Sequence, residues 1–138
     1  MKPEVMEGIR RHIQAVGGLE NAQILEISPG HARLSVYVTK ESLNLYGNAH
    51  GGFLFSLCDI AAGMSTYAYE FTNVTQNSNI QYLKGISEGL IYIEANALHK
   101  GRKTVVHQVQ ITNDKGQLIV NATFTMFLLE PLDLDSEK

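Results

Sequence analysis

The chain has 138 residues, 44% of them hydrophobic, which is enough for one domain with a substantial core. A formal net charge of −3 and a pI near 5.9 disfavour nucleic acid as a main partner, and a single cysteine excludes a disulfide framework. The first 18 residues carry charges throughout, without the apolar segment of a signal peptide, so we expect a cytoplasmic location. We therefore expect one domain over residues 1–138, acting as an enzyme or a binding protein.

The first 40 residues predict one helix and two strands. Apolar residues recur at helical spacing over residues 3–16, within an N-terminal segment 1–18. We expect this stripe to pack on the core as a lid; a helix lying on a membrane surface is the less favoured alternative. Residues 22–28 and the alternating residues 32–39 are typical of strands joined by a Pro-Gly turn. The stripe consists of Val5, Ile9, Ile13 and Val16.

The stretch 44–69, NLYGNAHGGFLFSLCDIAAGMSTYAY, is the longest apolar run in the chain. Its apolar residues recur at helical spacing and also occupy the other faces, which is typical of a buried helix. Its length is close to that of a membrane span, but Asp59 lies in the middle, and a carboxylate in dry surroundings needs a partner or a role. We therefore predict a central buried helix that carries an acid, with Cys58 as an inert core thiol.

Beyond residue 70 the pattern predicts four strands, at 73–83, 90–99, 104–112 and 118–129. His107 interrupts an apolar face, and we expect it to be a hydrogen-bonded structural histidine. The last strand is expected to turn alternate residues from Leu118 to Leu128 inward, and residues 131–138 to form a flexible acidic tail. The order of elements predicts an α+β fold in which one antiparallel sheet curls around one long helix.

One spaced motif resembles the hotdog-fold thioesterases, in particular the PaaI-like acyl-CoA thioesterase branch. The resemblance covers about residues 20–130. It implies a hotdog fold and hydrolysis of acyl-CoA thioesters without a metal or other cofactor. It also implies a homodimer, or a dimer of dimers, with sites at the subunit interface, and it places Thr75 near the attacking water. The motif consists of Asn44-x-x-Gly47-x-x-His50-Gly51-Gly52, then Asp59, Asn79-Ile80-Gln81-Tyr82-Leu83 and Gly101-Arg102-Lys103.

The residues of this motif have chemistry of their own. His50, Gly51 and Gly52 stand at the predicted helix start, where backbone N–H groups lack intrahelical partners and the helix dipole favours an anion. The N–H of Gly51 is thus a candidate oxyanion-hole donor for a thioester carbonyl. Asp59 is the candidate general base or nucleophile, and the sequence leaves both roles open.

The spacing of His50 and Asp59 bears on assembly. Nine helical residues span about 13 Å and turn about 900°, which leaves the two side chains on opposite sides of the helix. One chain therefore cannot bring both to the same thioester carbon. If both act, each site combines His50 of one subunit with Asp59 of another, which predicts two equivalent sites in a symmetric dimer.

The sequence also offers candidate residues for binding the CoA phosphates and the acyl group of a substrate. The basic turn at residues 100–103 and the nearby Lys84 are candidates for holding the CoA phosphates. Several large apolar residues suggest an acyl pocket. Two alternatives stay open: an acyl-CoA hydratase or dehydratase on the same fold, and a non-catalytic acyl-CoA-binding protein. The candidate substrate residues are Gly52, Tyr82, Lys84, Lys100, Arg102 and Lys103, and the candidate pocket residues are Phe53, Leu57, Met64, Tyr67 and Tyr82.

Overall fold

The computed structural model describes residues 1–14 and 21–134, with the backbone alone for residues 12–14. The helices and strands follow the order expected from the sequence, with a short 3₁₀ turn added before the central helix. No helix in this part of the chain is long and apolar enough to cross a membrane. The elements are α1 (Pro3–Gln14), β1 (Gln23–Ser28), β2 (His31–Val38), the turn Lys40–Ser42, α2 (Gly51–Tyr67), β3 (Phe71–Tyr82), β4 (Gly89–Lys100), β5 (Thr104–Asn113) and β6 (Leu118–Pro131).

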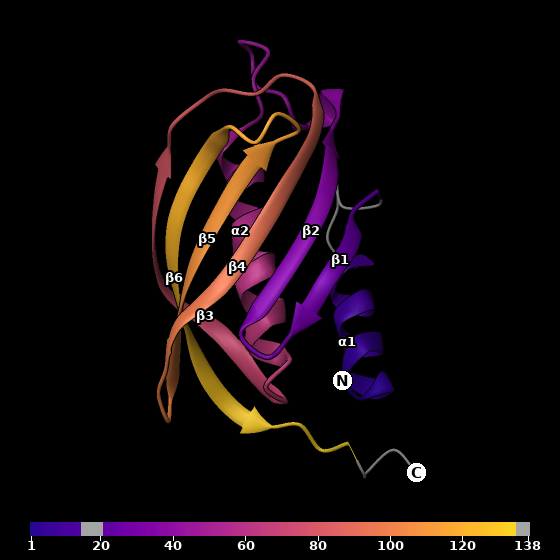
Figure 1. Cartoon of the computed structure of the whole chain (residues 1–138), viewed down its shortest axis with the longest axis vertical. Helices are drawn as coiled ribbons and strands as arrows, with labels where there is room; N and C mark the ends of the chain where they lie inside the picture. Colours follow the sequence, from indigo (N-terminus) through magenta and orange to yellow (C-terminus); the bar gives the residue numbers. More distant parts are fainter. Residues whose placement is uncertain (15–20, 135–138) are drawn as a thin grey trace.

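The strands within the described residues form one antiparallel, six-stranded sheet in the order β1-β2-β4-β5-β6-β3. Figure 1 shows the sheet curving past α2, which lies behind it in this view, with α1 beside strand β1. Alternate residues of β2, β4, β5 and β6 face α2 and are buried, as their period of two requires. The predicted α+β architecture, a curled antiparallel sheet around one long helix, is confirmed.

Helix α1 packs on α2 as the apolar stripe predicts. Val5 and Ile9 are 0% and 2% exposed and belong to the main core. The rest of the predicted stripe, the Ile13 side chain and Val16, lies outside the described residues. The two buried side chains tie α1 to the body of the protein, so α1 is a wall of the core rather than a free helix.

Helix α2 is buried on one side only, so the prediction of a helix buried all round is wrong. Leu57, Cys58 and Ala61 are fully buried against the sheet, whereas Gly52 and Ser56 are exposed and Asp59 is half-buried. The physical reason is that one sheet covers only one side of a cylinder. The opposite side of α2 therefore forms a strip of small and polar residues that is uncovered in the single chain.

Strand β3 stands at the edge of the sheet, and among the described strands it pairs with β6 alone. Most of its twelve residues are exposed, and none of them is fully buried. This explains the polar sequence of residues 75–79, which is unusual for a strand next to a buried helix. A long edge strand exposes a row of backbone N–H and C=O groups, and proteins normally cover such an edge.

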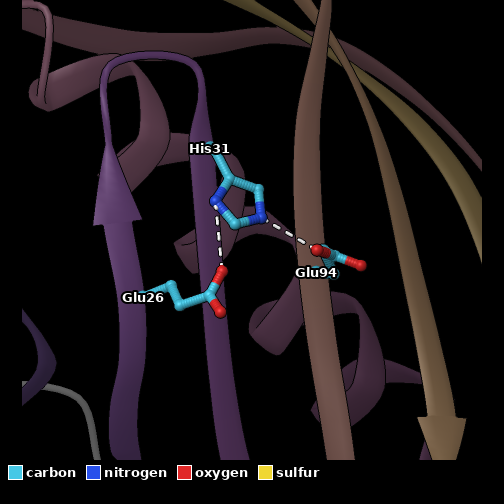
Figure 2. A network of polar contacts seen from close by, with 3 residues as sticks. All are labelled: Glu26, His31 and Glu94. Carbon is cyan, nitrogen blue, oxygen red and sulfur yellow. Dashed lines mark hydrogen bonds and ion pairs between the residues drawn. The ribbon is translucent and has the colours of Figure 1, made fainter.

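The other edge of the sheet carries a three-residue polar cluster, drawn in Figure 2. His31 on β2 lies 2.8 Å from a carboxylate oxygen of Glu94 on β4 and 3.7 Å from one of Glu26 on β1. The cluster thus links three neighbouring strands on the outer face of the sheet. Because the Glu26 and Glu94 side chains are 59% and 45% exposed, solvent screens the cluster and it contributes little to stability.

The last strand differs in detail from its prediction. Leu118 is 36% exposed rather than inward, because it lies at the first position of β6, where the sheet ends; the alternate residues from Val120 to Leu128 are buried as expected. The predicted flexible tail is anchored at its start: the Leu132 N–H donates to the Glu70 carbonyl (2.8 Å), and Leu134 packs against the core. Residues 135–138 of that tail lie outside the described residues.

Candidate active site

The loop that leads into α2 is built by Asn44. Its side-chain oxygen accepts hydrogen bonds from the N–H groups of Tyr46 (2.9 Å) and Asn48 (3.1 Å). Its own N–H donates to the Asn48 carbonyl (2.7 Å), and Gly47 has a positive φ of 83°, which suits a glycine. Asn44 therefore shapes the loop that delivers His50 to the helix start, and its side-chain oxygen is used for that purpose.

The first turn of α2 presents N–H groups that lack an acceptor within the helix. The first helical hydrogen bond runs from Leu54 N to the carbonyl of His50 (3.1 Å), so the N–H groups of residues 51–53 have no acceptor within the helix. His50 is the N-cap residue, its side chain is exposed, and it makes no cap hydrogen bond. Its N–H donates to the Ser42 carbonyl (2.7 Å), which fixes the turn. The arrangement is an anion-favouring helix start with a histidine beside it.

Tyr82 closes this turn from the end of β3. Its hydroxyl donates to the Gly51 carbonyl at 2.8 Å, and a Cβ on residue 51 would lie only 3.2 Å from the tyrosine ring. Glycine at this position therefore lets the ring pack against the backbone. Partial burial, with a smaller contribution from Cys58, raises the pKa of the Tyr82 phenol. Lys84 follows two residues later and is exposed at the same end of α2.

The middle of α2 holds the acid. Asp59 is half-buried, and the hydroxyl of Thr75 on β3 donates a hydrogen bond to its Oδ1. The structure thus brings together two residues that the sequence places 16 positions apart. Both line a cavity of about 320 Å³ between α1, α2, β3 and β6. The other lining residues are Gly8, Ile9, Gly63, Met64, Tyr67, Thr72, Asn73, Val74 and Met126.

Two other ionisable residues of the core, Cys58 and His107, are chemically inert, as predicted. Burial, with a smaller contribution from the adjacent Asp59, raises the pKa of the Cys58 thiol to about 12, so it is inert. His107 is fully buried; its Nε2 lies 2.7 Å from the Thr66 hydroxyl and its Nδ1 lies 3.3 Å from the Ser65 hydroxyl. Burial lowers the pKa of His107 to about 4. It is a neutral, hydrogen-bonded core residue, which confirms the structural interpretation.

The basic turn lies at the far end of α2. Lys100 stands 5.3 Å from the centre of the Tyr69 ring, just past the last residue of the helix, and Arg102 and Lys103 are exposed beside it. A helix of 17 residues is about 25 Å long. One chain therefore spreads the predicted groups over three places: the amides at the helix start, the acid at its middle and the cations at its end.

Comparison with known proteins decides the family. The family model described as "Thioesterase superfamily" matches residues 46–120 of this chain. These residues include both the start of α2 and Asp59. This chain belongs to the thioesterase superfamily. Acyl-coenzyme A thioesterase PaaI from Escherichia coli is 28% identical over 97 residues, which cover 70% of this chain and 69% of that protein.

Solved structures agree with this family in fold. A hypothetical thioesterase from Streptococcus pneumoniae, determined with coenzyme A, is 38% identical with a TM-score of 0.86, over 93% of this chain and 99% of that one. A Streptococcus mutans protein bound to acetyl CoA is 36% identical with a TM-score of 0.82, over 88% and 99% of the two chains. The sheet around α2 is therefore the hotdog fold that the resemblance implied.

Two further structures concern alanine variants of a Streptococcus pneumoniae hypothetical thioesterase. One replaces an aspartate, at 40% identity and a TM-score of 0.78 over 80% of this chain and 93% of that one. The other replaces a threonine 16 positions later, at 39% identity and a TM-score of 0.80 over 84% and 96%.

Sequence reasoning missed part of the cavity. Of the predicted pocket residues, Met64 and Tyr67 line it, whereas Phe53 and Leu57 lie elsewhere on α2 and Tyr82 stands at the helix start. The contribution of α1 was also missed. A glycine at position 8 in the middle of an amphipathic helix was the available signal, because glycine costs helix stability and usually has a packing reason.

Proposed function

We propose that the protein is an acyl-CoA thioesterase that hydrolyses an acyl-CoA to the free acid and CoA. The observation that carries this proposal is the half-buried Asp59, hydrogen-bonded by Thr75 at the wall of a cavity with a largely apolar lining. A carboxylate beside an apolar cavity suits attack on an acyl carbon. Membership of the thioesterase superfamily supports the same reaction class.

At the acid, each side chain has a defined part. The Thr75 hydroxyl uses its one hydrogen to donate a hydrogen bond to Asp59 Oδ1. Its lone pairs therefore remain able to accept a hydrogen bond from a water molecule. Asp59 takes a proton from that water as the water attacks the thioester carbonyl carbon. In the alternative route, Asp59 attacks the carbon itself and water then hydrolyses the mixed anhydride. Both routes break the C–S bond and release the CoA thiolate, which is protonated.

The candidate oxyanion donor at the start of α2 is too far from Asp59 of its own chain to serve the same thioester. The free N–H of Gly51 starts α2 and Asp59 lies eight residues later, about 12 Å along the axis. We therefore place the Gly51 N–H and His50 of one subunit opposite Asp59 of another. His50 polarises the carbonyl or assists the leaving thiolate, Gly52 admits the ligand close to the backbone, and Asn44 positions the loop.

The same logic applies to the CoA end. Arg102 and its neighbouring lysines stand at the end of α2, far from His50 of their own chain. An antiparallel arrangement of two copies brings them toward the partner's helix start. The uncovered edge of β3 and the uncovered strip of α2 are the surfaces for this homodimer, which a dimer of dimers would retain. Lys84 lies already at the helix start and is the further phosphate contact.

Relatives support the assignment. The Streptococcus structures contain coenzyme A and acetyl CoA, respectively. The aspartate and the threonine replaced in the pneumococcal variants are 16 positions apart, as Asp59 and Thr75 are. We infer that the same pair serves the reaction in this chain.

The primary test is a CoA-release assay over short, medium, long and aryl acyl-CoAs. Wild-type protein should release CoA from at least one of them, and Asp59→Asn should lower kcat about a hundredfold or more, as loss of a general base does, while the fold persists. Hydration of crotonyl-CoA without CoA release would indicate a hydratase instead. Near-wild-type turnover by folded Asp59→Asn protein would refute the role of the acid.

Mixed dimers test the shared site. Subunits carrying Asn44→Ala and His50→Ala retain the acid, and Asp59→Ala subunits retain the helix start. Each homodimer should be inactive, and mixing should restore part of the activity, because a heterodimer contains one intact composite site. Mixed dimers that form, as verified by mass, yet remain inactive would contradict the shared site.

A further inference from the structure

The cavity beside Asp59 follows the axis of α2. Asp59, Gly63 and Tyr67 occur at intervals of four residues and all line it. Residues with this spacing lie on one helix face, and the first and last of them are about 12 Å apart along the axis. The cavity is therefore an elongated groove that begins at the acid and reaches the last turn of α2.

Gly63 keeps the middle of the groove open. A Cβ at this position would lie 3.9 Å from both Asn73 Oδ1 and Met126 Cε, which is ordinary van der Waals contact. Packing within the chain therefore has room for alanine here, although glycine in a helix interior costs about 1 kcal/mol relative to alanine. A residue that gives up helix stability without a packing reason is consistent with space kept for a ligand.

The far end of the groove is closed by Tyr67 and α1. A Cβ on Gly8 would lie 2.6 Å from the Tyr67 hydroxyl oxygen and 3.1 Å from the ring, so the hydroxyl end of the tyrosine packs against α1 at this glycine. Ile9, next along α1, is 2% exposed and lines the cavity beside it. Val5, one turn earlier, is fully buried but does not line the cavity. The end wall is thus anchored in the core.

We propose that Gly63, Tyr67 and Ile9 set the maximum length of the acyl group. This inference rests on the proposed function, with the acyl carbon held at Asp59. An extended chain advances roughly 1.2 Å per bond, so about ten bonds fit before the chain meets Tyr67. A cavity of 320 Å³ is at the small end of ligand pockets and about twice the size of one that binds benzene. The groove selects medium-length acyl chains and excludes long ones.

Binding of non-hydrolysable S-alkyl-CoA thioethers of increasing length measures this limit directly, by calorimetry. Wild-type affinity should rise about fourfold per methylene and then level off near ten carbons, where further methylenes stay outside. Gly63→Leu fills the groove one turn from the acid. It should move the plateau to about five carbons, since the four residues from Asp59 to Gly63 rise about 6 Å. It should leave the thermal midpoint unchanged or higher, because leucine favours helix.

The end wall is tested by a matched pair of α1 variants. Ile9→Ala and Val5→Ala each shorten one buried side chain of the same helix, but only Ile9 faces the groove. Ile9→Ala should move the plateau to longer chains and raise the affinity for S-dodecyl-CoA about tenfold relative to S-octyl-CoA. Val5→Ala should leave that ratio at its wild-type value. The ratio is insensitive to a loss of folded protein, because both ligands are measured on the same sample.

Binding and turnover separate this inference from the proposed function. If the chain length at which affinity levels off is the same in wild type, Gly63→Leu and Ile9→Ala, the proposed length limit is wrong. CoA release by the same samples would still support the thioesterase function. A plateau that moves as described, in a protein that releases no CoA, would support the length limit as a property of an acyl-CoA-binding protein. Equal shifts in Val5→Ala and Ile9→Ala would show that undocking of α1 alone opens the groove, which would also overturn it.

Discussion

The buried His107 predicts an acid-sensitive fold. Thr66 donates its hydroxyl proton to the Ala62 carbonyl at 2.8 Å, so it accepts from His107 Nε2–H, and Nδ1 is left to accept from Ser65. The folded state therefore holds the neutral imidazole. Burial lowers its pKa from 6.5 to about 4. Between these values the unfolded chain binds a proton that the native chain does not, so stability falls as pH falls.

The size of the effect follows from the two pKa values. A difference of about 2.5 units corresponds to about 3 kcal/mol of unfolding free energy. This stability is present above pH 6.5 and is lost progressively down to about pH 4. For a chain of this length the loss lowers the thermal midpoint by about 10 °C. His107 on β5 is hydrogen-bonded to α2, the helix that carries Asp59. Protonation of His107 should therefore also disturb the candidate active site.

The assay compares wild type with His107→Gln, which stays polar and does not titrate. Urea unfolding is measured at fixed protein concentration from about pH 7.5 to about pH 4. Over this range the unfolding free energy of wild type should fall by about 3 kcal/mol more than that of His107→Gln. Carboxylates titrate in both proteins and cancel in the difference. Parallel pH profiles of the two proteins would refute the assignment of His107 as a buried neutral base.

Two further outcomes are expected at the site. Thr75→Val removes the donor to Asp59 at nearly constant shape and should lower kcat about tenfold or more, since a hydrogen bond to a charged group contributes about 1.5–3 kcal/mol; Thr75→Ser should keep most of the activity in the same steady-state assay. Arg102→Glu with Lys103→Glu should raise KM for acyl-CoA about tenfold with little change in kcat, because phosphate contacts are equal in the ground and transition states. A truncated thioester without the nucleotide is the control, and an equal loss on both substrates would show that the turn serves the fold.

Most of the fold could be predicted from local sequence patterns. The alternating apolar residues of β4 to β6 and the long apolar run of α2 each admit one secondary structure, and the order of elements leaves few ways to cover one helix with strands. What sequence periodicity does not contain is which side of a helix stays open. In the structure Gly52 and Ser56 are exposed, because the sheet covers only the opposite face of α2.

The site was predicted in its parts but not in its arrangement. The pairing of Asp59 with Thr75 depends on the register of β3 against β6, which has an irregularity between Thr75 and Asn77. Such a bulge changes which side chains face inward and leaves no clear mark in the sequence. The wall that α1 adds to the cavity depends on how two helices pack, which a single glycine signals only weakly.

The composite site leads to one more prediction, on the position of the two-fold axis. In an antiparallel pair of α2 helices, Gly51 of one copy faces Asp59 of the other only if the axis passes near residue 55, which is midway between them. Phe55 packs on Phe124 of the sheet, with ring centres 5.2 Å apart, so it faces inward. The neighbouring Ser56 is exposed and therefore lies close to its own copy across the axis.

Engineered cysteines test this position. The native Cys58 is buried and does not compete. Small side chains at Gly52 and Ser56 let two helices approach to about 8 Å between axes, so residues at the crossing come within disulfide range, with Cα atoms about 4.4–6.8 Å apart. Ser56→Cys should form a covalent dimer under mild oxidation on a non-reducing gel. Ser87→Cys, which is equally exposed but lies outside α2 and β3, should stay monomeric.

The result also decides where each group of the active site comes from. A cross-link at residue 56 places the helix-start amides of one subunit beside Asp59 of the other. It also brings the basic turn of the subunit that supplies Asp59 toward the helix start of the first. If Ser56→Cys stays monomeric on the gel while the protein is a dimer in solution, the axis passes elsewhere. Gly51 and Asp59 then belong to different sites, and the oxyanion donor must be sought among groups nearer to the acid, such as Asn73, which lines the same cavity.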